Sequence, residues 1–336
     1  MKRFLSLFLL TALVLTLFAG CGGSGKTKPV EGGMKIATTT ADFGAYSDKH
    51  TELIDYLHQA GFRYIDLSFY SLESMDPFME DDWQEYAQQL KKHVADKKME
   101  FVQAHSFGGN AFKDQQTYDK IVKYTIRSIE ACAILGIPQI VVHAPYESHM
   151  TEEEFFKKAL DFYEEFFPVM EKTGVKALIE NSAEKIVGCD TYFYTGATMR
   201  KFLEYANNPL LGACWDTGHA NIQGSQYFDI IDLGEYLWGI HVADNQGEED
   251  EHLMPYVGTM SIDEVMSALV KIGYKGAFTF ECENTLNTGN TWPNPRATYK
   301  DSLKAYMPSL ELKLEMEKVL LQIGEHILTK YEIPIG

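Results

Sequence analysis

Eight short apolar runs alternate with longer amphipathic stretches along the chain, and this alternation constrains the fold more than any other feature. The runs predicted as strands are residues 34–38, 62–67, 99–105, 139–143, 175–181, 210–216, 238–243 and 276–282. Strands that alternate with helices favour a parallel sheet, because each helix returns the chain to the same end of the sheet. Eight such repeats in one continuous unit predict an α/β fold of the (β/α)₈ TIM barrel type.

Helix signals fall between these runs. A helix that begins at Thr151 has Glu154 in the capping-box position, and a helix over 261–272 is followed by Gly273. A long helical region is predicted over about 297–330. A doubly wound open sheet is the alternative fold. Such sheets usually carry a glycine-rich phosphate turn after the first strand, and residues 38–42 do not form that motif.

The N-terminus has the pattern of an export signal. Lys2 and Arg3 precede an apolar stretch over 4–18, and small residues then lead to Cys21. This pattern resembles a bacterial lipoprotein signal, in which the cysteine is lipidated; an ordinary secretory signal or a membrane anchor is the alternative. We therefore expect a signal peptide over 1–20, a flexible tether over 21–33 and a barrel with its C-terminal helical region over 34–336. The protein would be exported and held at a membrane surface through lipidated Cys21.

The charge of the chain narrows the choice of partner. With 48 acidic and 30 basic residues, the formal net charge is -18. Such a surface repels phosphate backbones, so nucleic acid is not an expected partner, whereas uncharged sugars are not excluded. The cysteines besides Cys21 form no CxxC pair, and we expect buried free thiols at Cys132, Cys189, Cys214 and Cys282.

Polar groups stand at or near the ends of six predicted strands. A single histidine or glutamate at a strand end is more often structural than functional, but six consecutive strands are poorly explained by coincidence. Because the carboxyl ends of barrel strands meet at one mouth, these groups are expected to lie close together. They are His105, His143, Glu180, Asp216, His241 and Glu281.

Four of these groups have the chemistry of a metal site. Glu180, Asp216, Glu281 and His241 supply three carboxylates and one imidazole, a set that suits Mn²⁺ best, with Mg²⁺, Co²⁺ or Zn²⁺ as alternatives. Four protein ligands leave positions open for a carbonyl and a neighbouring hydroxyl of a sugar. Glu180 and Glu281 could then stand on opposite sides of the substrate, one removing a proton and the other returning it.

Four motifs on the last four strands carry a family resemblance: Leu178-Ile179-Glu180-Asn181, Trp215-Asp216-Thr217-Gly218-His219, Ile240-His241-Val242-Ala243-Asp244-Asn245 and Phe280-Glu281. In this order they resemble the xylose isomerase-like barrel superfamily of sugar isomerases and epimerases, and more distantly endonuclease IV, over about residues 34–305. The resemblance implies that Glu180, Asp216, His241 and Glu281 bind the metal. It also implies that the two glutamates are the acid/base pair and that His219 contacts a substrate oxygen.

A further set of residues matches the positions at which endonuclease IV holds a trinuclear zinc cluster. Sugar-active relatives use similar residues to bind substrate hydroxyls, and the acidic charge and export signal argue against DNA repair. We therefore expect substrate binding from His105, His143, His219, Asp250 and His252. For the last two, an acidic surface loop over 248–252 is the simpler interpretation.

Three functions are compatible with this sequence. The leading one is a metal-dependent sugar isomerase or epimerase that transfers a proton adjacent to a carbonyl through a metal-bound enediolate. The second is a lyase or hydrolase of 3-keto-glycosides that uses the same site, and the third is a non-catalytic sugar-binding lipoprotein. Because sugar phosphates are cytoplasmic, an exported enzyme would take a free sugar, a polyol or a glycoside.

Overall fold

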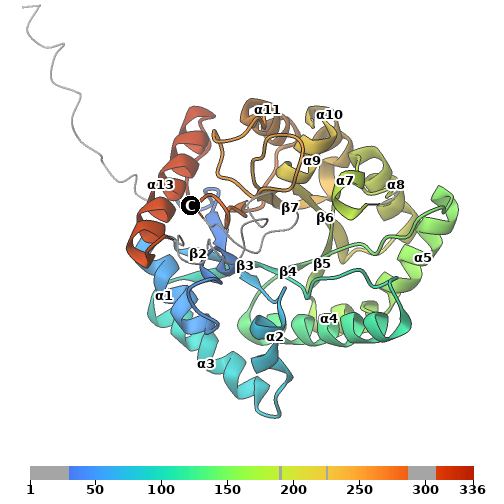
Figure 1. The fold of residues 1–336 in the computed structure, drawn as a ribbon, viewed down its shortest axis with the longest axis horizontal. Coiled ribbons are helices and arrows are strands. Elements are labelled where there is room, and N and C mark those ends of the chain that lie inside the picture. Colours follow the sequence, from blue (N-terminus) through green and yellow to red (C-terminus); the bar gives the residue numbers. More distant parts are fainter. Residues whose placement is uncertain (1–29, 189–190, 225, 287–307) are drawn as a thin grey trace, which may run out of the picture.

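A computed structural model describes residues 30–188, 191–224, 226–286 and 308–336, and its strands form a closed parallel barrel in sequence order (Figure 1). The strands are β1 Ile36–Thr39, β2 Tyr64–Ser68, β3 Glu100–His105, β4 Gln139–Val142, β5 Lys176–Glu180, β6 Leu211–Asp216, β7 Leu237–Val242 and β8 Phe278–Phe280. Pairing of β1 with β8 closes the barrel, with Ala37 opposite Thr279. The predicted TIM barrel is confirmed, and the open-sheet alternative is wrong.

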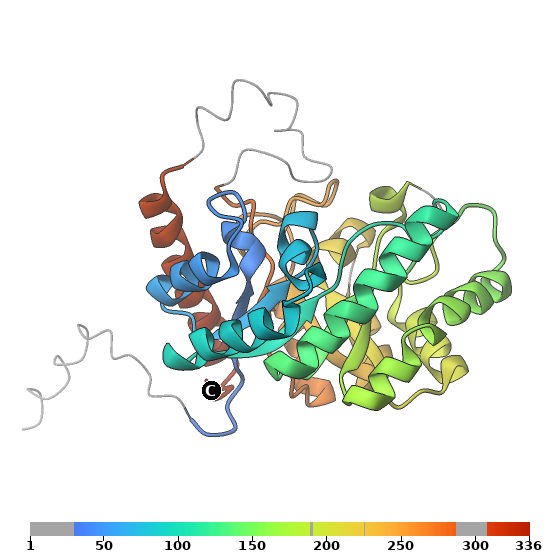
Figure 2. The ribbon, with the colours of Figure 1, turned by 90° about the horizontal axis from the view of Figure 1, so that it is seen from below.

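The helices form an outer ring around the strands, seen along the barrel in Figure 1 and from the side in Figure 2. The α-helices are α1 His50–Ala60, α2 Leu72–Met79, α3 Trp83–Asp96, α4 Gln115–Leu135, α5 Glu152–Glu164, α6 Phe167–Thr173, α7 Glu184–Val187, α8 Gly196–Ala206, α9 Thr217–Gln223, α10 Tyr227–Leu233, α11 Ile262–Ile272 and α13 Leu310–Lys330. Two 3₁₀ helices, η1 Thr40–Phe43 and η2 Gly234–Tyr236, follow β1 and precede β7.

Local signals place the helix ends where the sequence predicts them. The Thr151 side chain accepts from the Glu154 amide, and the Thr151 amide donates to the Glu154 carboxylate, so α5 begins with the expected capping box. Gly273 ends α11 with φ 67°, a left-handed conformation that favours glycine. Helix α13 begins at Leu310, so the first part of the helical region predicted over 297–330 lies outside the described residues.

The interior of the barrel is packed beneath the mouth. Val141, Leu178 and Cys214 form a buried cluster with Trp238 packed against it. Gly239 has no room for a side chain, because a Cβ there would lie 2.7 Å from Leu178 Cδ1. Solvent therefore has no path through the barrel at this layer, and chemistry is confined to the mouth above it.

Several predictions about the termini and cysteines have different outcomes. Cys132, Cys214 and Cys282 are free and buried, as predicted, whereas Cys189 lies outside the described residues. The signal peptide, Cys21 and most of the tether also lie outside them, so these assignments and the division of the chain stay predictions. Within the described part of the chain, no helix has both the length and the apolar character needed to cross a membrane.

Candidate active site

A cavity of about 700 Å³ opens at the carboxyl ends of the strands. Its wall includes every residue predicted from the sequence to bind substrate, together with both predicted catalytic glutamates. Asp216 and His241 are buried just beneath it, with exposed fractions of 0% and 1%. Loops far apart in the sequence therefore bring all the predicted site residues to one place.

The four predicted metal ligands meet around one point. Glu180, Asp216, His241 and Glu281 each offer a ligand atom, and these atoms lie within 4.8 Å of one another. Nδ1 of His241 lies 2.5 Å from Glu180 Oε1 and 3.2 Å from Glu281 Oε2. A shared coordination sphere requires side chains that converge in this way. Their positions along the sequence could not establish this convergence.

The chemistry of this set fits a divalent cation. Asp216 uses Oδ1 to accept the His219 amide at 2.6 Å, whereas its buried Oδ2 has no hydrogen-bond partner. Burial raises the pKa of Asp216, and repulsion from Glu180 adds to the effect. Burial also raises the pKa of Glu281 to about 7. A cation would satisfy the orphaned oxygen and stabilise the ionised carboxylates.

The two glutamates have contrasting surroundings. Burial alone would raise the pKa of Glu180, but the neighbouring imidazoles, led by His241, hold it well below its usual value. Glu180 Oε2 lies 2.6 Å from His143 Nε2 and 3.7 Å from His105 Nε2. Glu281 has two histidine neighbours, His241 at 3.2 Å and His252 at 3.9 Å, but burial outweighs them and its pKa stays raised. Without a bound cation, the two carboxyl groups therefore favour opposite protonation states.

Asp250 joins the remaining two histidines. Its Oδ2 lies 2.9 Å from His252 Nε2 and 3.3 Å from His219 Nε2. Burial lowers the pKa of both imidazoles, but Asp250 and nearby carboxylates outweigh it and raise both pKa values well above the usual range. Asp250 is 5% exposed, so it belongs to the wall of the site and not to a solvated acidic loop. Its predicted contact with substrate stays a prediction.

Two buried residues that the sequence analysis did not select support His241 from below. Asp66 Oδ2 lies 3.1 Å from His241 Nε2 and accepts from Gln103 Nε2 at 2.8 Å, and Gln103 Nε2 itself lies 2.9 Å from His241 Nε2. If Nε2 carries the proton and donates to Asp66, the Nδ1 lone pair faces Glu180 and Glu281, as a metal ligand must. The available signal was a carboxylate inside an apolar strand, since Asp66 stands between Ile65 and Leu67.

We expect Asp66→Ala to weaken binding of Mn²⁺ about 10- to 100-fold, because His241 loses the partner that fixes its ring and tautomer. Competition with a fluorescent chelator measures this affinity without an activity assay. Asp55→Ala is the matched control, since Asp55 holds His93 at 2.7 Å on the outside of the barrel. Unchanged affinity in the Asp66 variant would show that the ring is positioned without it.

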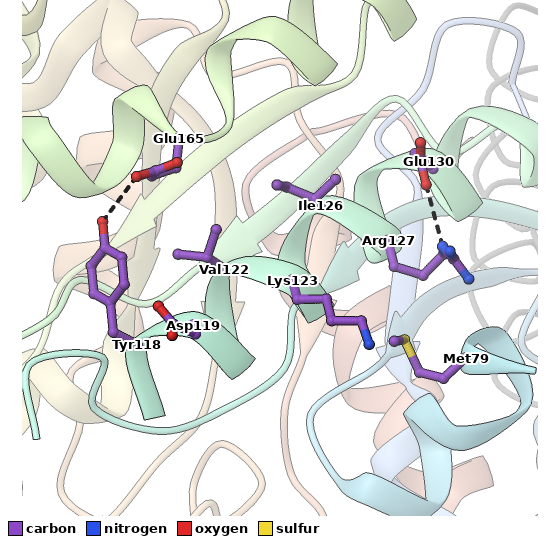
Figure 3. Close-up of a pocket in the computed structure, with 9 residues that line it drawn as sticks. All are labelled: Met79, Tyr118, Asp119, Val122, Lys123, Ile126, Arg127, Glu130 and Glu165. Atoms are coloured by element: carbon purple, nitrogen blue, oxygen red, sulfur yellow. Dashed lines mark hydrogen bonds and ion pairs between the residues drawn. The ribbon is translucent and has the colours of Figure 1, made fainter. Parts of the chain in front are cut away.

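A second hollow lies outside the barrel and is unrelated to this chemistry. It has a volume of about 420 Å³ and lies along α4, next to Met79 of α2 and Glu165 after α5 (Figure 3). Its polar side chains are largely paired with one another, as in the Arg127–Glu130 contact at 3.2 Å. None of the predicted site residues lines it.

Comparison with protein families places the chain among known barrels. The family described as xylose isomerase-like TIM barrel matches residues 54–309. A ketose 3-epimerase of Arthrobacter globiformis is 37% identical over 90 residues, which cover 26% of this chain and 29% of that protein. Another curated relative is the uncharacterized protein y4fM of Sinorhizobium fredii, which is 24% identical over 159 residues. The match covers 46% of this chain and only half the length of that protein.

Solved structures share the fold at lower identity. D-psicose 3-epimerase of Clostridium cellulolyticum H10, solved with D-tagatose, has a TM-score of 0.69 and 15% identity, covering 88% of this chain and 99% of its own. The IolI protein with a bound zinc atom has a TM-score of 0.67 and 18% identity, covering 89% and 99%. The 3-keto-D-glucoside 4-epimerase YcjR of E. coli has a TM-score of 0.60 and 20% identity, covering 82% and 98%.

Proposed function

Because the chain belongs to the xylose isomerase-like TIM barrel family, we propose that it is a metal-dependent sugar isomerase or epimerase. The observation that carries this proposal is the meeting of Glu180 and Glu281 with Asp216 and His241 around one point. Ketose epimerases among the relatives and fold neighbours support the reaction class. The zinc atom bound by a fold neighbour supports a divalent metal, of which we favour Mn²⁺.

The proposed chemistry divides between the two glutamates. A divalent ion bound by the four ligands would polarise a substrate carbonyl and favour loss of the adjacent proton. Glu180, held ionised by its histidine neighbours, removes that proton. Glu281 supplies a proton from the other side, which inverts the carbon or shifts the carbonyl. His143 contacts Glu180 at 2.6 Å and keeps it in place. The imidazoles of His219 and His252, which both contact Asp250, lie at the wall where sugar hydroxyls would bind.

A second candidate reaction uses the same groups on a keto-glycoside. Loss of the proton next to the keto group would be followed by departure of a leaving group in place of proton return, giving a lyase or hydrolase of 3-keto-glycosides. The fold neighbour that acts on a 3-keto-D-glucoside favours this substrate class. Assays on free ketoses and on 3-keto-glycosides separate the two, because only the lyase or hydrolase releases the aglycone.

Removal of the metal tests the proposal against a non-catalytic sugar binder. We expect a chelator to abolish turnover and Mn²⁺ to restore it. At a free concentration about 100 times its dissociation constant, Mn²⁺ should stabilise the folded protein by about 2.7 kcal/mol, measured by thermal unfolding. Metal analysis should give one ion per chain; three would instead favour a trinuclear site, and the absence of both binding and restored turnover would favour the binder.

We also propose that the protein is exported and anchored through lipidated Cys21. Small residues before this cysteine and the apolar stretch that precedes them support the proposal. We expect Cys21→Ser to move the protein from the membrane fraction to the soluble fraction in cells, because the acyl chains are lost. Cys132→Ser is the control. Mass spectrometry of the N-terminal peptide should find diacylglycerol on Cys21, and retention of the serine variant in the membrane would point to a different anchor.

A further inference from the structure

The charge of the cavity wall limits which sugars the site can take. Among the described residues that line it there are six carboxylates and neither lysine nor arginine: the carboxylates are Asp48, Glu73, Glu180, Asp250, Glu281 and Glu283. Phosphates and carboxylates are usually bound by arginine forks, lysines or free helix N-termini. At the start of α2 the Ser74 amide donates to the Ser71 side chain, and α7, whose start has no side-chain cap, is a single turn of four residues. A bound divalent ion would offset only two of these six carboxylates, so a sugar phosphate or uronic acid would still meet excess negative charge on the wall.

The histidines do not reverse this field. His219 and His252 share the single carboxylate of Asp250, and His143 contacts Glu180 at 2.6 Å. Each of these imidazoles is thus already in contact with a protein carboxylate. A substrate anion would have to displace those contacts, whereas an uncharged hydroxyl can share them.

The size of the cavity exceeds what one sugar ring needs. On the scale at which a water molecule takes about 30 Å³, a hexose takes roughly 200 Å³. The cavity measures about 700 Å³. A monosaccharide held at the four converging ligands would leave room for a second group of ring size.

The walls on either side of the centre differ in chemistry. On the side of β4 and β5, Ala144 follows β4, and Ile186 and Val187 belong to α7. Phe193, which follows that helix, is fully buried. On the side of β1 and β2, the polar residues Ser47, Asp48 and Glu73 line the cavity together with the apolar Leu53 and the ring of Tyr70. The apolar wall adjoins Glu180, the last residue of β5, so a group attached to the reacting sugar can reach it. Sugar rings and aglycones present C–H faces that pack well on such surfaces.

We propose that this site takes an uncharged glycoside, with the reacting ring at Glu180 and Glu281 and a second ring on the apolar wall of Ala144, Ile186 and Val187. The site discriminates against sugar phosphates and sugar acids. This inference rests on the proposed function, because it presupposes that a sugar is bound between the two glutamates.

Matched ketoses test the inference on the Mn²⁺-loaded full chain. D-fructose, D-fructose 6-phosphate, and the disaccharides isomaltulose and maltulose share one fructose unit. Isomaltulose carries its glucosyl group at O6, where the phosphate is attached, and maltulose carries it at O4. Calorimetry should show at least one disaccharide binding about tenfold more tightly than fructose, and the phosphate binding at least tenfold more weakly. Equal or stronger binding of the phosphate would overturn the charge argument. Weaker binding of both disaccharides than of fructose would overturn the second-ring site.

A substitution in the apolar wall tests whether the second ring binds there. Val187→Trp fills the space beside Ile186, so it should lower affinity for the favoured disaccharide at least tenfold more than affinity for fructose. Val319→Trp, at a side chain 44% exposed on α13, should change neither. Equal losses for both sugars in the Val187 variant would overturn the assignment. If fructose is turned over but no disaccharide binds better, the inference fails alone; if the loaded protein binds none of these sugars, the proposed function fails with it.

Discussion

Replacement of Glu281 by glutamine should lower turnover by a factor of about 100 or more while the barrel stays folded. Glutamine keeps the size of the side chain and one oxygen for contact with His241, but it cannot accept or release a proton. The backbone at this position is held by the amide contact with Val242 at 3.2 Å, which the substitution does not touch. The measurement is kcat for a ketose at saturating Mn²⁺, because Glu281 is also a predicted ligand.

Hydrogen exchange separates loss of proton transfer from loss of metal. In deuterated water, a Glu281→Gln variant that still holds its metal should exchange the substrate hydrogen that faces Glu180 while failing to complete the reaction. Glu130→Gln, on the outer helix α4, is the matched control and should leave kcat unchanged. Near-normal turnover in the Glu281 variant would remove this residue from the mechanism, and loss of both exchange and bound metal would assign it a ligand role.

The strands and their polar ends were predictable because the barrel repeats a simple pattern. Each buried parallel strand is a short apolar run, and its carboxyl end must face the mouth. Glu180 and Asp216 therefore appear in the structure at the ends of β5 and β6, as predicted. The eighth strand is shorter than predicted and stops at Phe280, which leaves Glu281 just beyond it, at the edge of the cavity.

The contact of Asp66 with His241 could not be predicted from the sequence, because it depends on strand register. The pairing of β2 with β3 shifts between Ile65 and Asp66, so Asp66 lies opposite Gln103 where an unbroken register would place Val102. A shift of one residue reverses which side chains face the interior. No local pattern in the sequence marks this irregularity, so the position of Asp66 under His241 emerges only from the folded barrel.

The last helix, α13, also has a buried contact that could not be predicted from the sequence. The sequence predicts a helical region up to Lys330, but periodicity does not reveal that its first turns bury a charged pair. Lys313 Nζ lies 2.8 Å from Glu317 Oε1, and their side chains are 1% and 0% exposed. Asp42, in η1 after β1, is buried beside them and accepts from the Thr38 hydroxyl. The pair therefore joins α13 to the start of the barrel.

We expect Lys313→Met to lower the free energy of unfolding by about 3–5 kcal/mol, the cost of leaving buried carboxylates without their cation. This loss corresponds to a fall of roughly 10 °C in Tm. Thermal unfolding of the metal-free protein measures it without interference from ligand binding. Lys318→Met is the control, because Lys318 pairs with Glu315 at 2.6 Å on the exposed face of the same helix and should stay close to the wild type.

The loss should also depend on pH in a defined direction. Burial raises the pKa of Asp42 and of Glu317, while Lys313 opposes both shifts. A carboxyl group whose pKa is higher in the folded state binds more protons there than in the unfolded chain, so stability falls as pH rises from its usual pKa through the raised one. Without Lys313 both pKa values rise further, and the destabilisation should be larger at about pH 8 than at about pH 5. An equal loss at both values would mean that packing of the lysine stem, and not its charge, holds α13 against β1.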